Sequence, residues 1–424
     1  MSELTGKALL EAAARRACRW TWVGESRRRQ VRWVAAEYGR ALDHPDHPLG
    51  DDEHTTRETL FREVPVAAYL ALGRRGALRV RAAADPGRAS DASEQVRIAS
   101  LALLVQALGA ERFAQLPPQP DPPAKTPVAP RPRAALRESL RELADRPGAT
   151  PDRVRMLAIG TVVTDTAARA GELCAAGLED LSPTLEDLRL VRRRQGASPD
   201  AAYAELLTLS GLARAAVRRW LAERHELLSH VAGGATALWV SLRPNHRGGA
   251  AIPPGTPLRP RGLARAWRAA VEEANAALAG EPSWTPLPTR MEQLRRGVDP
   301  EGRMAPRRPD AERAAQLLKD VARAGAALAA ARADAEEGST DELAARVPVR
   351  QALRAAWAEG IEHQVLLAAL ADAGLHDTAA LAAAGWDPAL LHAIDRAWSG
   401  ARRCPRWGAG TRPGLGAGRP EPPA

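Results

Sequence analysis

The sequence of 424 residues has few cysteines, and it lacks long apolar runs. Its cysteines, Cys18, Cys174 and Cys404, are odd in number and far apart, so they predict neither a disulfide framework nor a zinc site. No stretch approaches the roughly 20 uninterrupted apolar residues of a membrane span, and the N-terminus has no signal-peptide core. We therefore expect a cytoplasmic protein with no membrane association.

Several motifs of enzymes are also missing. The sequence has no Gly-x-x-x-x-Gly-Lys phosphate loop, no Gly-x-Ser-x-Gly elbow and no His/Cys cluster with metal-ligand spacing. Asp43 and Asp46 lie close to His44, His47 and His54, but these residues share one proline-containing loop. A solvated turn explains that group better than a metal site does. We expect no metal and no cofactor.

Aromatic residues make up only 4% of the chain, whereas apolar residues make up 45% and are mostly alanine and leucine. Alanine and leucine favour helices, and the β-branched and aromatic residues that favour strands are scarce. The length allows two or three domains, each with its own core. The composition thus predicts a mainly α protein.

Lysine is nearly absent, since only Lys7, Lys125 and Lys319 occur among 60 basic residues. A genome rich in G and C replaces lysine with arginine, which explains this ratio but not the net charge of +9. Arginine binds phosphate oxygens through two parallel N–H groups. The net positive charge favours a nucleic-acid partner.

A proline-rich stretch from Leu116 to Pro132 marks the clearest domain boundary, because prolines lack the N–H that helices and inner strands need. We expect a semi-rigid linker there and a disordered Pro/Gly/Arg-rich tail. The predicted parts are a helical domain at 1–116, the linker at 117–133, a mixed domain at 134–300, alanine-rich helices at 301–400 and the tail at 401–424.

Periodicity predicts the elements inside these parts. Helical periodicity runs through 4–39, 56–72, 92–108, 134–144, 151–163, 211–228, 261–279, 309–335 and, with glycine breaks, 347–398. Residues 185–192 and 202–209 alternate with period two around the turn residues Gly196-Ala-Ser-Pro, which predicts a hairpin. Ala237 to Leu242 is an apolar run that predicts a short strand. Thr150 is the expected cap of the helix at 151–163.

The segment Asp165-Thr-Ala-Ala-Arg-Ala-Gly-Glu-Leu173 resembles the first catalytic box of the tyrosine recombinases, also called phage integrases. The later hairpin, helix, apolar run, helix and Leu294-Arg-Arg follow in the order of that family's catalytic domain. This resemblance covers about 134–298, and the N-terminal helices are similar to the family's core-binding domain. It implies a protein that binds double-stranded DNA, and a homo-oligomer on DNA is compatible with it.

Box by box, the resemblance assigns Arg169 and Arg295 to the pair of arginines that hold the scissile phosphate, whose negative charge grows in the transition state. Glu172 matches a buried acidic position that supports the helix start around the first arginine; its alternative is an exposed surface glutamate. Glu292 stands where the family has histidine. Arg296 and the hairpin residues Arg192, Arg193 and Arg194 are the other expected DNA contacts.

Two departures from the family concern the chemistry. The hairpin has arginines where the family has a lysine acting as general acid, and a guanidinium with a pKa above about 12 is a poor proton donor. No tyrosine follows Tyr203; Tyr203 precedes the second box, and Tyr38 and Tyr69 belong to the first domain, so the nucleophile stays unknown.

Three functions stay open at this point. The first is a DNA-binding, recombinase-like protein that is impaired in strand cleavage on its own. The second is an active recombinase with a nonstandard nucleophile or one from a partner subunit. The third is a helical regulatory or scaffold protein without a DNA role. Trp357, His363, His376, Trp386 and His392 give no match to the family's third box and are expected to pack or lie on solvated faces.

Overall fold

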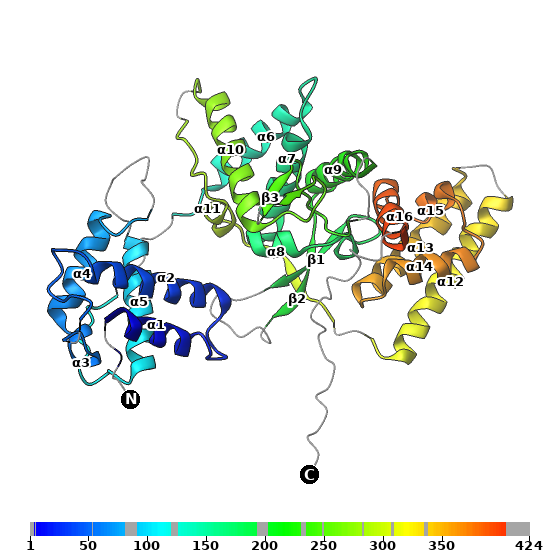
Figure 1. The fold of residues 1–424 in the computed structure, drawn as a ribbon. Coiled ribbons are helices and arrows are strands. Elements are labelled where there is room, and N and C mark those ends of the chain that lie inside the picture. The colour runs from blue at the N-terminus through cyan, green and yellow to red at the C-terminus, as the bar shows by residue number, and fades with distance from the viewer. Residues whose placement is uncertain are drawn as a thin grey trace, which may run out of the picture. The chain divides into compact units, whose positions relative to one another are not determined.

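The structure is a computed structural model in which the chain packs into two compact units. The boundary between them falls at Lys125 and Thr126, within the proline-rich segment, and the elements of both units are labelled in Figure 1. The described residues are 4, 6–52, 54–80, 91–119, 126–192, 202–229, 235–247, 250–281, 284–306, 309–334 and 338–403. Within them, no helix has the length and apolar character needed to cross a membrane.

The described part of the first unit is helical. Its helices are α1 (Gly6–Ala17), α2 (Glu25–Leu42), α3 (Arg57–Leu60), α4 (Glu63–Arg75) and α5 (Asp91–Leu108). Tyr38 and Tyr69 stack in the core with their ring centroids 4.5 Å apart. The predicted continuous helical stretch over 4–39 is wrong in one respect: it forms two helices, because a turn over 18–24 separates α1 from α2.

The second unit begins with helices built around one buried helix. They are α6 (Pro130–Asp145), α7 (Pro151–Thr166), α8 (Ala170–Ala175), α9 (Gly211–Ser229), α10 (Pro260–Leu278) and α11 (Met291–Arg296), with the short 3-10 helix η1 (Leu178–Asp180). Helix α7 is buried along most of its length, and α6, α9, α10 and α11 pack against it. Thr150 does precede α7 in an extended conformation, but its side chain makes no capping hydrogen bond.

The predicted hairpin is confirmed. Strand β1 (Asp187–Arg192) pairs antiparallel with β2 (Tyr203–Thr208). The expected turn residues between them lie outside the described residues. A third strand, β5 (Gly302–Met304), extends this sheet along β2 and is not predicted by the sequence pattern.

A separate two-stranded sheet consists of β3 (Asn245–Arg247) and β4 (Ala250–Ile252), which the pattern also does not predict. The strand expected from Ala237 to Leu242 is wrong. Ala237 and Val240 instead form isolated bridges to Gly177 and Pro257. Leu238, Trp239 and Val240 of this run are buried, but burial alone does not require ladder pairing.

In the part of the chain that the structure describes, five helices follow the sheet: α12 (Ala311–Asp334), α13 (Thr340–Ala358), α14 (His363–Asp372), α15 (Thr378–Ala383) and α16 (Pro388–Arg403). They belong to the same compact unit as the hairpin. Arg354 of α13 binds Asp187 of β1, with Nη2 2.8 Å from Oδ1. The guanidinium of Arg189 lies 4.7 Å from the ring centroid of Trp357. These contacts attach α13 to the strand that follows the Arg169 segment.

Candidate functional site

A tight turn between α7 and α8 places Arg169. Helix α7 ends at Thr166, and Ala167 has φ of 51°, the left-handed region that favours glycine. The Thr166 hydroxyl accepts the N–H of Ala168 at 3.3 Å. Arg169 then returns to an extended conformation and precedes the first residue of α8. Its side chain keeps 39% of its surface exposed.

The carboxylate of Glu172 supports this helix start. Glu172 is only 6% exposed, and its Oε2 accepts the backbone N–H of Arg169 at 2.9 Å. Because the first N–H groups of a helix have no partner inside the helix, this bond stabilises the start of α8. Nη1 of Arg169 lies 3.4 Å from Oε1 of the same carboxylate. Glu172 thus lies in the buried position that the resemblance implies, and not on the surface.

Arg192, at the end of β1, connects the hairpin to the helix start. Its Nη1 donates to Glu172 at 3.0 Å, its Nη2 to the carbonyl of Thr166 at 2.6 Å, and its Nε to Glu205 of β2. Arg192 is 9% exposed. We call Arg169, Glu172, Arg192 and Glu205 the helix-start cluster. All three guanidinium nitrogens of Arg192 are engaged by Glu172, Glu205 and the carbonyl of Thr166. The predicted contacts Arg193 and Arg194 lie outside the described residues.

A second cluster lies on α11. Glu292 accepts two parallel hydrogen bonds from Arg295, with Nε 2.6 Å from Oε2 and Nη2 2.7 Å from Oε1. Nε of Arg296 donates to Oε1 of the same carboxylate at 2.8 Å. We call these three residues the α11 cluster. The fork of Arg295 therefore holds a carboxylate in the two-bond geometry that it would use for a phosphate.

The charge of the α11 cluster is positive at neutral pH. Burial alone would raise the pKa of Glu292, but hydrogen bonds from Arg295 and Arg296 outweigh it and hold the pKa below its usual value. Glu292 is therefore an anion, and it neutralises only one of the two guanidinium groups. The remaining positive charge is available to attract a polyanion.

Both clusters are attached to one hydrophobic core. Leu173, next to Glu172, and Leu294, next to Arg295, are buried in the same cluster of apolar side chains. Helix α11 is also tied to the segment before α6, because Val128 donates its N–H to the carbonyl of Gln293 at 3.1 Å. A Cβ at Gly297 would lie 2.5 Å from the Val128 carbonyl oxygen, so this close approach requires glycine.

Among the described residues of this part of the unit, no side chain matches by motif the nucleophile that the resemblance implies. Cys174 follows Leu173 in α8, but burial raises the pKa of its thiol to about 12, which leaves almost no thiolate at neutral pH. Tyr203 is the first residue of β2 and lies directly opposite Arg192 in the strand register. Among the described residues, no group of three His, Cys, Asp or Glu side chains could hold a metal ion.

The sequence pattern pointed to Arg169, Glu172, Arg192, Glu292 and Arg295 but missed their partners. Glu205 and Thr166 carry no motif, and both reach Arg192 only through strand register and the turn after α7. Period-two alternation does place Glu205 on the same face of β2 as Tyr203, and this is the signal in the sequence that could have identified Glu205. The i,i+3 spacing of Glu292 and Arg295 on a helix was a second signal.

Comparison with known proteins gives matches only among solved structures. No family model and no curated protein matches the sequence. A crystal structure of XerA recombinase has 14% identity, covers 67% of this chain and 80% of its own, and has a TM-score of 0.26. XerH site-specific recombinase, solved in a post-cleavage complex with its palindromic difH substrate, has 13% identity, coverages of 63% and 66%, and a TM-score of 0.42. The Tn1549 transposon integrase, in complex with a circular intermediate DNA, has 12% identity, coverages of 68% and 84%, and a TM-score of 0.42. These matches are to two recombinases and an integrase, all at low sequence identity.

Proposed function

We propose that the protein binds double-stranded DNA as a tyrosine-recombinase-like protein, with Arg169 and Arg295 contacting a backbone phosphate, and that it does not cleave strands on its own. The observation that supports this most is the helix-start cluster. A buried Glu172 fixes the backbone of Arg169 while 39% of the Arg169 side chain stays exposed. A guanidinium that is positioned but accessible is what phosphate binding requires.

The α11 cluster supports the same proposal from the second box. Arg295 and Arg296 share one carboxylate, so phosphate oxygens can replace Glu292 on one guanidinium without leaving the carboxylate unpaired. Arg192 has no part in this contact, because its donors hold Glu172, Glu205 and Thr166. We assign Arg192 the role of positioning the helix start.

A salt titration of binding tests the proposal. The full chain is titrated with a fluorescent 30-base-pair duplex at several salt concentrations, together with an Arg169→Ala/Arg295→Ala variant. Each lost phosphate contact should reduce the salt slope by about 0.9. Affinity should fall about tenfold or more, since a hydrogen bond to a charged group contributes about 1.5–3 kcal/mol.

Arg323→Ala is the matched control, because Arg323 also pairs with an acid three residues away and its side chain is 80% exposed. It should leave duplex affinity unchanged. Affinity that barely responds to salt, or a double variant that behaves like Arg323→Ala, overturns the proposal. The scaffold function then becomes the better account of the pairs between arginine and glutamate.

A second function, strand cleavage by a nonstandard nucleophile, is favoured by one observation. Tyr203 lies opposite Arg192 in the β1–β2 ladder, and directly opposed residues point to the same face of a sheet. In this reaction the phenolic oxygen would bond to phosphorus, the bond to the 5′ oxygen would break, and water would relay the phenolic proton to that oxygen. A suicide substrate with a nick, run on a denaturing gel, detects the adduct. No adduct, or equal adduct in Tyr203→Phe, rejects this function.

A further inference from the structure

The turn between α1 and α2 in the first unit presents two tryptophans to solvent. The rings of Trp20 and Trp22 stack with centroids 5.2 Å apart and planes 15° from parallel. Trp22 is 64% exposed, whereas Trp20 packs against the core of the unit. One face of the Trp22 ring therefore rests on Trp20, and most of the rest of the ring meets water. Leaving an indole exposed to water in this way is unfavourable, and a ligand that covers the ring removes this cost.

The backbone of the turn fixes this pair. Trp20 donates its N–H to the carbonyl of Ala17 at 3.3 Å, and Val23 donates to the carbonyl of Trp20 at 3.2 Å. Val23 is 2% exposed and anchors the turn in the protein. Nη2 of Arg28 also donates to the carbonyl of Trp20 at 3.2 Å. Trp22 is thus held in place before any ligand arrives, which reduces the entropy lost on binding.

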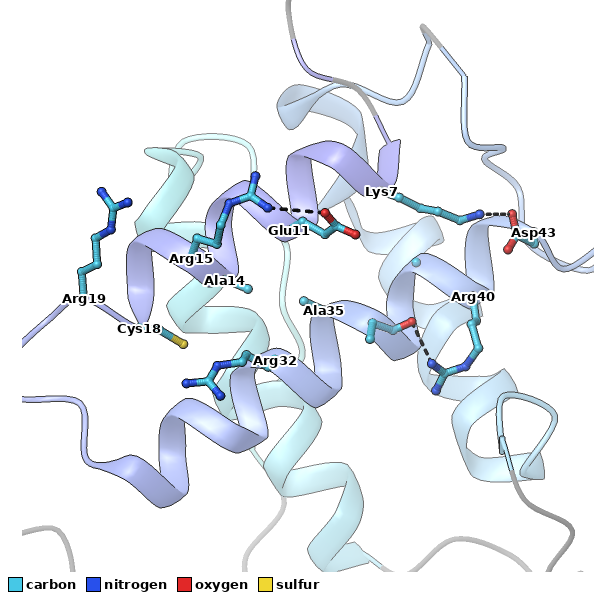
Figure 2. Close-up of a pocket in the computed structure, with 12 residues that line it drawn as sticks. Lys7, Glu11, Ala14, Arg15, Cys18, Arg19, Arg32, Ala35, Arg40 and Asp43 are labelled. Atoms are coloured by element: carbon cyan, nitrogen blue, oxygen red, sulfur yellow. Dashed lines mark hydrogen bonds and ion pairs between the residues drawn. The ribbon is translucent and has the colours of Figure 1, made fainter. Parts of the chain in front are cut away.

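The surroundings of the pair are strongly basic. Residues 8–34 contain seven arginines and two glutamates. Arg19 and Arg32 are exposed, and no carboxylate within the described part of the chain forms an ion pair with either. Figure 2 shows both at the end of the groove between α1 and α2 where Cys18 lies, whereas Lys7 and Asp43 lie at the other end. Arg19 directly precedes Trp20 in the sequence.

The groove itself has a volume of about 580 Å³, within the roughly 300–1,000 Å³ of small-molecule sites. Its floor consists of small residues, among them Ala14, Ala35 and Gly39. Of the acids that line it, Glu11 faces Arg15 at 3.4 Å and Asp43 binds Lys7. The end near Arg19 and Arg32 therefore keeps its positive charge.

We propose that this end of the first unit binds single-stranded DNA by stacking an unpaired base on Trp22 while Arg19 and Arg32 hold the neighbouring phosphates. Every base has a π face, so stacking on an exposed indole needs no particular sequence. A base inside a duplex already has stacking partners on both faces and does not fit this surface. The site goes beyond the duplex contact proposed for the second unit and shares no residue with it.

Binding of single strands by the full chain tests the proposal. The probes are a fluorescein-labelled 20-mer of thymidine and an abasic 20-mer with the same phosphates. Trp22→Ala should weaken binding of the thymidine 20-mer by about 5- to 150-fold, the range for losing one base–aromatic stack. The abasic 20-mer should bind more weakly than the thymidine 20-mer, and Trp22→Ala should not change its affinity.

Two variants serve as controls for the role of the ring. Trp22→Tyr keeps an aromatic face and should retain most of the affinity. Val64→Ala alters an apolar side chain that is 66% exposed on α4 and should change nothing. The thermal midpoint of both variants at position 22, measured alongside binding, shows that the protein is folded at the assay temperature, so weak binding cannot be attributed to unfolding.

The arginines are tested by the salt dependence of single-strand binding. Arg19→Ala/Arg32→Ala should reduce the slope by about 0.7 for each lost phosphate contact. Arg169→Ala/Arg295→Ala should still bind the thymidine 20-mer in a manner that depends on Trp22, so the two proposals fail separately. Equal affinity of the wild type for thymidine and abasic strands, unchanged binding by Trp22→Ala, or an unchanged slope overturns the single-strand site.

Discussion

The guanidinium of Arg192 donates to the buried carboxylate of Glu172 across 3.0 Å, although the two residues belong to a strand and a helix 20 residues apart in sequence. This ion pair joins the end of β1 to the start of α8. Since Glu172 also accepts the backbone N–H of Arg169, the hairpin and the first arginine of the site form one connected network. The position of Arg169 therefore depends on Glu172, in addition to the charge balance of the network.

We expect Glu172→Gln to destabilise the second unit. The substitution keeps the shape of the side chain but removes its charge and replaces one oxygen with an NH2 group. Oε2 accepts from both Arg192 and the backbone N–H of Arg169, and Oε1 faces Nη1 of Arg169, so a donor loses its acceptor whichever oxygen is replaced. Removing a hydrogen bond to a charged group costs about 1.5–3 kcal/mol of unfolding free energy. Urea denaturation followed by circular dichroism measures it. Glu142→Gln on the exposed face of α6 is the control and should stay within about 0.5 kcal/mol of the wild type; an equally small effect at Glu172 would contradict the network.

The turn before Arg169 gives a prediction of opposite sign. Ala167 adopts a left-handed conformation, with φ of 51°, that costs an L-residue about 1–2 kcal/mol. Glycine adopts it freely but loses more entropy on folding, about 0.4–1 kcal/mol. Ala167→Gly should therefore raise the unfolding free energy by up to about 1 kcal/mol.

Ala222→Gly, on the exposed face of α9, should instead lower it by about 1 kcal/mol. Thermal denaturation compares the two, and a lower midpoint for Ala167→Gly would show that no strain is stored at this turn.

The features that sequence reasoning reached are local, and those it missed are not. The hairpin was predictable because β1 and β2 alternate and are close in sequence. Strand β5 has only three residues, which is too short for a recognisable alternating pattern. It also pairs with β2 from about 100 positions away in the sequence. The strand predicted from Ala237 onward is wrong because an apolar run indicates burial only. Burial does not distinguish a strand from irregular backbone with isolated bridges, such as those at Ala237 and Val240.

The site divides in the same way. The Glu292–Arg295 pair follows from helical spacing, which sequence shows directly. The pairing of Arg192 with Glu172 and Glu205 depends on strand register and on the turn at Ala167, and neither is visible in a single sequence. The sequence therefore predicts that Arg192 contacts DNA, whereas its N–H groups bond to Glu172, Glu205 and Thr166 inside the protein.

Glu292 should weaken DNA binding in the wild type. Its carboxylate occupies the fork of Arg295 and the Nε of Arg296, so it competes with phosphate and repels it. One unit charge a few ångströms from a phosphate in water is worth about 1 kcal/mol, or roughly fivefold in affinity. Glu292→Gln should therefore bind the duplex about fivefold more tightly at low salt. The gain should shrink at high salt because screening grows. Glu312→Gln, at an exposed position in the first turn of α12, is the charge-matched control; an equal gain there would show only the effect of net charge.

His363 should make the second unit sensitive to mild acid. Its imidazole is fully buried, with Nε2 3.0 Å from the carbonyl oxygen of Leu181, and Nδ1 has no hydrogen-bond partner among the described residues. Burial lowers the pKa of His363 to about 4, from an ordinary value of 6.5. Between these values the unfolded chain binds a proton that the folded chain does not, so the unfolding free energy falls as the pH falls from about 6.5 to 4.

The expected loss for His363 is about 2 kcal/mol between pH 7 and pH 5, since one pKa unit corresponds to about 1.4 kcal/mol. Urea denaturation at both pH values measures it. His363→Gln removes the titrating group and should flatten this dependence, even if the substitution lowers stability at both pH values. His376→Gln changes an exposed histidine and should keep the dependence of the wild type. If His363→Gln loses as much stability on acidification as the wild type does, another group carries the effect, and the neutral buried imidazole does not link α14 to the segment at Leu181 in the way described.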